Sequence, residues 1–144
     1  MNSKVTPEML TRFWLIIDGV PSDIKIDEEN DYDLYADFIN RILSKAPQQE
    51  LKNFDITLRE LKLKLERANL KWGDRTYGLS DDGFDYFCYW VISRGSLVYN
   101  GVIEDVTRID GPMNQVVKTE FEDICYVVSK IWKKKFPNDP YDLK

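Results

Sequence analysis

The side chains best suited to chemistry lie together in one central stretch, residues 80–90. This stretch reads Ser-Asp-Asp-Gly-Phe-Asp-Tyr-Phe-Cys-Tyr-Trp, so three carboxylates and five aromatic rings fall within eleven residues. Carboxylates spaced by four residues share one face of a helix and can hold a hard cation or transfer protons. One hypothesis is therefore a small-ligand- or divalent-metal-dependent enzyme or sensor. Its candidate contacts to a ligand or partner are Asp81, Asp82, Asp85, Tyr86, Arg94 and Tyr99.

A structural interpretation of the same stretch is simpler and is favoured. Ser80 is a good N-cap, and Asp81 and Asp82 would complement the helix dipole in the first turn. The helix that follows is apolar almost all round, which is typical of a central, buried helix. We therefore assign no catalytic residue, no metal ligand and no cofactor, and the role of the three carboxylates stays open.

Several kinds of active site are excluded by residue type. The chain has no histidine, so it has neither a Ser-His-Asp nor a Cys-His catalytic arrangement. Two cysteines without histidine are too few for a tetrahedral zinc site. Cys88 and Cys125 both fall in apolar helical patterns, and we expect two buried thiols in a reducing compartment rather than a disulfide.

Composition indicates a folded, acidic domain. The chain has 144 residues, of which 43% are hydrophobic and 13% aromatic, enough for one compact core. Its net charge of −5 and pI of about 4.8 disfavour a nucleic-acid partner and suit a basic protein partner. Neither a signal peptide nor an apolar run long enough to span a membrane is evident, so we expect a cytoplasmic protein with no membrane partner.

The hydrophobic pattern is helical nearly throughout and predicts an all-α fold. Thr6 and Pro7 begin one helix that Gly19 ends, and Pro47 opens the helix with the clearest spacing. The other helices are expected after an acidic loop over 22–33, from Ser80 to a break at Gly95, through 97–103, and over 119–136. We expect one compact domain over 1–144 with about five to seven helices, little or no sheet, and residues 119–136 packed on the rest.

The acidic loop does not have the pattern of a calcium site. An EF-hand loop starting at Asp27 needs glycine at its sixth position and glutamate at its twelfth, where this chain has Tyr32 and Phe38. The loop is instead interpreted as solvated negative charge that a basic partner can meet. Residues 106–118 allow no prediction of structure.

The central stretch also carries a family resemblance. Residues 80–87, followed by Trp-Val-Ile at 90–92, Gly95 and Val-Tyr at 98–99, resemble the signature of domain-of-unknown-function family 4240. Residues 13–18, Phe-Trp-Leu-Ile-Ile-Asp, are similar to the opening helix of that family, and the helix around Phe54 to its middle element. The resemblance covers about residues 6–106 and implies a bacterial protein without a settled activity. Cys88 stands where the family typically has arginine, which puts an Asp–Arg pair in doubt here.

Size, negative charge, abundant aromatic residues and the missing catalytic residue types favour an interaction module. We expect a protein-binding role, immunity-like or regulatory, in which an acidic surface meets a basic partner. The alternative is the ligand- or metal-dependent enzyme or sensor described above. The sequence predicts no oligomeric state.

Overall fold

The computed structural model describes residues 4–21, 23–24, 32–69, 88–104 and 123–139, and these ranges contain helices and no β-strand. The prediction of an all-α fold is confirmed. A further helical segment, residues 88–93, directly precedes α5. The labelled helices are α1 (Pro7–Asp18), α2 (Tyr32–Leu43), α3 (Gln48–Asn69), α5 (Ser96–Glu104) and α6 (Asp123–Lys135).

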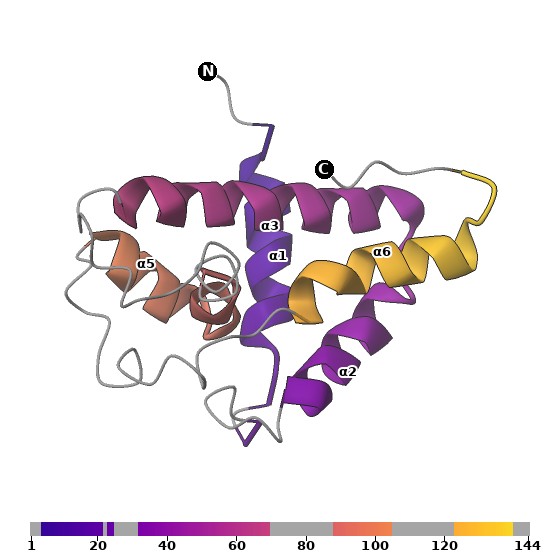
Figure 1. Cartoon of the computed structure of the whole chain (residues 1–144), viewed down its shortest axis with the longest axis horizontal. Helices are drawn as coiled ribbons and strands as arrows, with labels where there is room; N and C mark the ends of the chain where they lie inside the picture. The colour runs from indigo at the N-terminus through magenta and orange to yellow at the C-terminus, as the bar shows by residue number, and fades with distance from the viewer. Residues whose placement is uncertain (1–3, 22, 25–31, 70–87, 105–122, 140–144) are drawn as a thin grey trace.

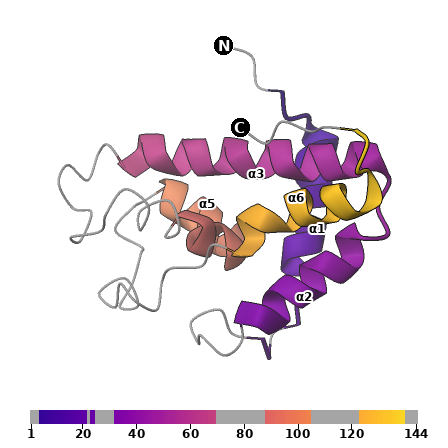
Figure 2. The same ribbon diagram turned by 45° about the vertical axis from the view of Figure 1, so that its right-hand side comes forward.

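The long helix α3 lies along one side of the molecule, and α1 runs across it (Figures 1 and 2). The last helix, α6, packs against α2 and α3, while α5 contacts α1 and α3. Helices from the beginning, middle and end of the chain therefore share one core. The two ends of α2 face different neighbours: its first turn lies near the end of α1, and its last turn leads directly into α3 (Figure 1).

The boundaries of α1 follow from local capping, as predicted. The Thr6 hydroxyl accepts a hydrogen bond from the Met9 backbone N–H at 3.1 Å, and Pro7 occupies the first helical position, where its missing N–H matters least. Gly19 follows the last helical residue as the C-cap. These two ends set the length of α1, which places Asp18 at the terminus that faces α5.

The spacing of three and four residues in α3 places its apolar side chains in the core. The five predicted positions, which are Leu51, Phe54, Leu58, Leu61 and Leu65, are all buried. Each such burial stabilises the fold by about 1.5–3 kcal/mol. The opposite face carries local ion pairs, such as Lys62 with Glu66 at 2.7 Å.

Aromatic contacts connect the helices across the core. Phe13 of α1 packs against Phe54 of α3 with ring centroids 4.7 Å apart, and Trp14 packs against Tyr99 of α5 at 5.4 Å. Edge and tilted arrangements of this kind add to the stabilisation that burial alone provides. The break predicted at Gly95 is present, since α5 starts at the next residue.

Some sequence-based expectations need correction, and one lies outside the described residues. Cys88 is buried but Cys125 is half-buried, because α6 turns positions 124, 127, 128 and 131 to the core and leaves Cys125 at its edge; both remain thiols. Leu34 and Leu97, expected among the core-facing residues of their helices, are exposed. The capping box predicted at 119–122 lies outside the described residues, and the described part of the last helix ends in the three expected lysines.

Candidate functional site

The structure places only part of the acidic site predicted from the sequence. Asp81, Asp82, Asp85 and Tyr86 lie outside the described residues, as does the proposed Ser80 cap. Arg94 and Tyr99 are described, and each has a defined structural environment. A site formed by the three carboxylates with Tyr86, Arg94 or Tyr99 nearby therefore stays a prediction.

Tyr99 is a buried connection between three helices. Its hydroxyl donates a hydrogen bond to the Leu61 carbonyl of α3 at 2.8 Å, and its ring contacts Trp14 of α1. Burial raises the pKa of Tyr99 above its usual range, and the nearby Cys88 and Glu60 act in the same direction. The phenol therefore stays protonated and continues to donate this hydrogen bond at neutral pH.

Arg94 follows the helical segment 88–93 and is half-buried. Its guanidinium carbon lies 4.8 Å from the centroid of the Trp90 ring, which is a cation–π contact. Trp90 is itself almost completely buried. Arg94, one of the six candidates from the sequence, thus lies on the outer side of a buried aromatic residue.

A polar junction between α1 and α5 contains residues that sequence reasoning did not select. The Asp18 carboxylate accepts hydrogen bonds from the Ser96 backbone N–H at 2.9 Å and from the Ser96 hydroxyl at 2.5 Å. Gly95, between the two helical segments, has a φ of 107°, and a Cβ added there would lie 2.9 Å from an oxygen of Asp18. The only hint in the sequence was that Asp18 and Gly95 both belong to the motifs of the family resemblance.

Tyr35 extends this junction to α2. Its buried hydroxyl donates to the Ser93 carbonyl at 2.9 Å. Burial raises the pKa of Tyr35 above its usual range; the Ser93 side chain acts to lower it, and the negative charge of Asp18 raises it further. The Ser93 hydroxyl is buried without a hydrogen-bond partner in the described structure. The junction holds α1, α2 and α5 in one arrangement, which is a structural role.

The first turns of α2 form an acidic surface with an exposed leucine. Leu34 is 52% exposed and lies between Asp33 and Asp37, both exposed, on the outer side of the helix. We call Asp33, Leu34 and Asp37 the acidic face.

The other end of α2 borders a hollow of opposite charge, with a volume of about 570 Å³. Three cationic side chains surround it, and one carboxylate, Glu50, lies 3.8 Å from Arg12. We call it the cationic hollow; its lining residues are Arg12, Phe38, Arg41, Ile42, Lys45, Ala46, Pro47 and Glu50. The four-residue spacing of Arg41 and Lys45 was visible in the sequence, but the approach of Arg12 was not.

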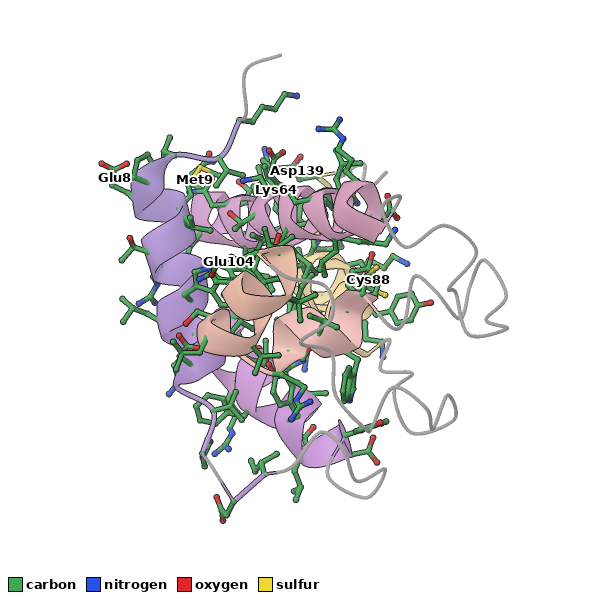
Figure 3. All side chains as sticks on the ribbon, turned by 90° about the vertical axis from the view of Figure 1, so that its left-hand side faces the viewer. Glu8, Met9, Lys64, Cys88, Glu104 and Asp139 are labelled. Carbon is green, nitrogen blue, oxygen red and sulfur yellow. The ribbon has the colours of Figure 1, made fainter. Side chains whose placement is uncertain are left out.

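A second, more apolar hollow of about 520 Å³ adjoins the first. Arg12 and Glu50 line both hollows, so their ion pair lies on the boundary between them. Phe13 and Phe54 line the second hollow, and Glu8 and Met9 border it from the N-terminal end of α1 (Figure 3). In the described part of the chain, no group of three or more carboxylate or cysteine side chains is placed to hold a metal ion.

The family model described as protein of unknown function (DUF4240) matches residues 9–134. The chain belongs to this family. The DUF4240 match extends beyond the expected residues 6–106 and includes most of α6. The polar junction, the acidic face and the cationic hollow all lie within it. No curated protein and no solved structure matches the chain. None of the helices in the described ranges is both long and apolar enough to cross a membrane.

Proposed function

We propose that this DUF4240 protein is a protein-binding module, immunity-like or regulatory, whose acidic face meets a basic partner. The observation that carries the proposal is the position of exposed Leu34 between Asp33 and Asp37 on α2. The immunity-like role itself is supported by the small size and the net charge of −5. A bacterial origin and a cytoplasmic location are part of the same proposal, the first from the family resemblance.

The combination of residues matters more than the exposed leucine alone. Single apolar side chains on a surface are common and indicate nothing by themselves. Here the exposed Leu34 lies next to two exposed carboxylates of the same helix, Asp33 and Asp37. A basic partner would be attracted by the carboxylates and would then cover Leu34. Charge would therefore set the rate and orientation of binding, and apolar contact would add stability.

The proposal can be tested by affinity capture from the native host with matched variants. Asp37→Lys and Glu104→Lys make the same change in net charge, but Glu104 lies at the end of α5, outside the acidic face (Figure 3). Leu34→Ser and Leu97→Ser both replace an exposed leucine on a helix, and only Leu34 is in the acidic face.

We expect a basic protein to be captured by the wild type, Glu104→Lys and Leu97→Ser. Asp37→Lys and Leu34→Ser should capture much less of it. Direct titration of the purified partner should show the same order of affinities. Equal binding by Asp37→Lys and Glu104→Lys would show that the acidic face is not the binding surface, and failure to capture any basic protein would count against the role itself.

A further inference from the structure

We propose that the cationic hollow binds a small organic anion that carries a carboxylate or phosphate group on an apolar body. This site is separate from the acidic face, and the proposal does not depend on the protein-binding role. It rests on the charges around the hollow, the chemistry of its floor and its size.

The positive charges come from α1, from α2 and from the turn after α2, and they converge on one hollow. Arg41 lies in the last turn of α2, Lys45 lies in the turn that follows this helix, and Arg12 reaches the hollow from α1. The Arg41 guanidinium carbon lies 6.0 Å from the Phe38 ring centroid, which helps to hold it beside the hollow. This local excess of cations contrasts with the net charge of −5 of the whole chain.

A fourth cation lies close to the same end of α2. The Lys135 ammonium, in the last turn of α6, donates a hydrogen bond to the Ser44 carbonyl at 2.6 Å, next to Lys45 in the sequence. Lys135 does not line the hollow, but its charge adds to the positive potential there. Arginine forms paired hydrogen bonds with carboxylate and phosphate groups, so the cation set fits either anion.

The floor of the hollow is apolar, which argues for more than an inorganic ion. Phe38 and Ile42 are half-buried and Ala46 is buried, and together with Pro47 they supply aromatic and aliphatic surface beside the cations. The volume of about 570 Å³ lies in the range of small-molecule sites, roughly 300–1,000 Å³. A ligand with an anionic group and an apolar body would use both parts of the hollow.

Glu50 has a specific consequence for binding. It is the single carboxylate in the lining, and it lies 3.8 Å from Arg12 with both side chains well exposed. Exposed pairs of this kind are weak, so a ligand anion can compete with Glu50 for Arg12. Neutralising Glu50 should therefore strengthen binding, which is the opposite of what most changes in a binding site do.

The test is calorimetric titration of the full chain with sodium octanoate and with octyl phosphate, both below their micelle concentrations. Inorganic phosphate and octyltrimethylammonium are the comparison probes. We expect saturable one-site binding of at least one octyl anion, and much weaker binding of both comparison probes. The relative affinities of octanoate and octyl phosphate then distinguish a carboxylate site from a phosphate site.

Variants connect binding to the hollow. Arg41→Gln and Lys45→Gln should each weaken binding about tenfold, while Glu50→Gln should strengthen it about threefold. Lys133→Gln and Lys134→Gln are matched controls, because they make the same charge change at exposed positions outside the hollow. Circular dichroism checks that each variant is folded. If Arg41→Gln is not folded, Lys45→Gln still tests the proposal, because Lys45 is exposed.

Four results would overturn the proposal. The first is no saturable binding of either octyl anion at millimolar concentration. The second is equal weakening by the Lys133 and Lys134 controls, which would indicate non-specific charge attraction. The third is an affinity for octyltrimethylammonium equal to that for the octyl anions. The fourth is equal affinity for inorganic phosphate and octyl phosphate, which would show that an apolar body contributes nothing to binding.

Discussion

The carboxylate of Asp18, the last residue of α1, caps α5 by accepting hydrogen bonds from the backbone N–H of Ser96 at 2.9 Å and from its hydroxyl at 2.5 Å. The residue before Ser96 is Gly95, which has no side chain with which to cap the helix itself. Its φ of 107° also turns the chain sharply between the segment 88–93 and α5. One helix thus supplies the cap of another that is 78 residues away in sequence.

Replacing Asp18 with alanine should destabilise the fold. Loss of an N-cap typically lowers the free energy of unfolding by about 1–2 kcal/mol, and here both hydrogen bonds to Ser96 disappear. Asp18→Asn should have a smaller effect, because its amide oxygen can still accept from the Ser96 N–H. Urea unfolding measures both variants, with exposed Asp37→Ala as a control. An effect of Asp18→Ala no larger than that of the control would contradict the capping role.

Gly95→Ala should be destabilising for two reasons. The positive φ is unfavourable for any residue with a Cβ, which costs about 1–3 kcal/mol, and the new Cβ would lie 2.9 Å from an oxygen of Asp18. Because both changes damage the same cap, the double variant Asp18→Ala/Gly95→Ala should lose less stability than the sum of the single variants. Strictly additive losses in urea unfolding would show that the two residues act independently.

Stability should fall above about pH 10 as Tyr35 and Tyr99 begin to ionise in the unfolded chain. Below that pH both states keep the phenol proton. Above it only the folded state does, because burial raises the pKa of both tyrosines there. The free energy of unfolding should drop by about 1.4 kcal/mol per pH unit for each tyrosine.

Tyr35→Phe isolates one of these contributions. At pH 8 it should lower the free energy of unfolding by about 1 kcal/mol, because it removes the hydrogen bond to the Ser93 carbonyl. Between pH 8 and pH 11 the wild type should lose about 1.4 kcal/mol relative to Tyr35→Phe, most of it above pH 10, so the difference should close and then reverse sign. Urea titrations at the three pH values provide the comparison, with Tyr99→Phe as an independent repeat. Parallel stability profiles for wild type and Tyr35→Phe would rule out a raised pKa.

Ile39 and Leu97 differ in exposure, so replacing each with alanine should change the free energy of unfolding by different amounts. Ile39 of α2 is 0% exposed, and Ile39→Ala should lower the free energy of unfolding by about 2–5 kcal/mol through lost burial and a residual cavity. Leu97 of α5 is 89% exposed, and Leu97→Ala should change it by less than about 0.5 kcal/mol. Thermal or urea unfolding of the two variants tests the packing of α2, and similar losses for both would contradict it.

The carboxylates outside the described residues allow a direct test of the metal-dependent alternative. If Asp81 and Asp85 serve a helix N-terminus, Asp81→Asn/Asp85→Asn should lower stability by about 0.3–1 kcal/mol per charge. Magnesium, manganese and calcium at millimolar concentration should then leave the melting temperature of the wild type unchanged. Stabilisation by the substitutions, together with a metal-induced shift that only the wild type shows, would instead support a ligand or metal site.

Local signals predicted much of the secondary structure. The cap at Thr6, the stop at Gly19 and the interruption at Gly95 are all present where the sequence placed them. The five buried positions of α3 follow from spacing alone, because helical periodicity determines which side chains share a face. Leu34 and Leu97 show the limit of this reasoning, since an apolar residue on a predicted helix is buried only where another element covers it.

The sequence by itself determined the all-α class, the ends of α1, the inward face of α3 and the resemblance to DUF4240, because capping, periodicity and motifs depend on neighbouring residues. Only the tertiary structure decided that Asp18 caps Ser96, that Tyr35 meets Ser93 across 58 residues, and that Arg12 approaches Arg41 and Lys45. These contacts depend on how the helices cross, which is set by the packing of the whole core rather than by any one segment.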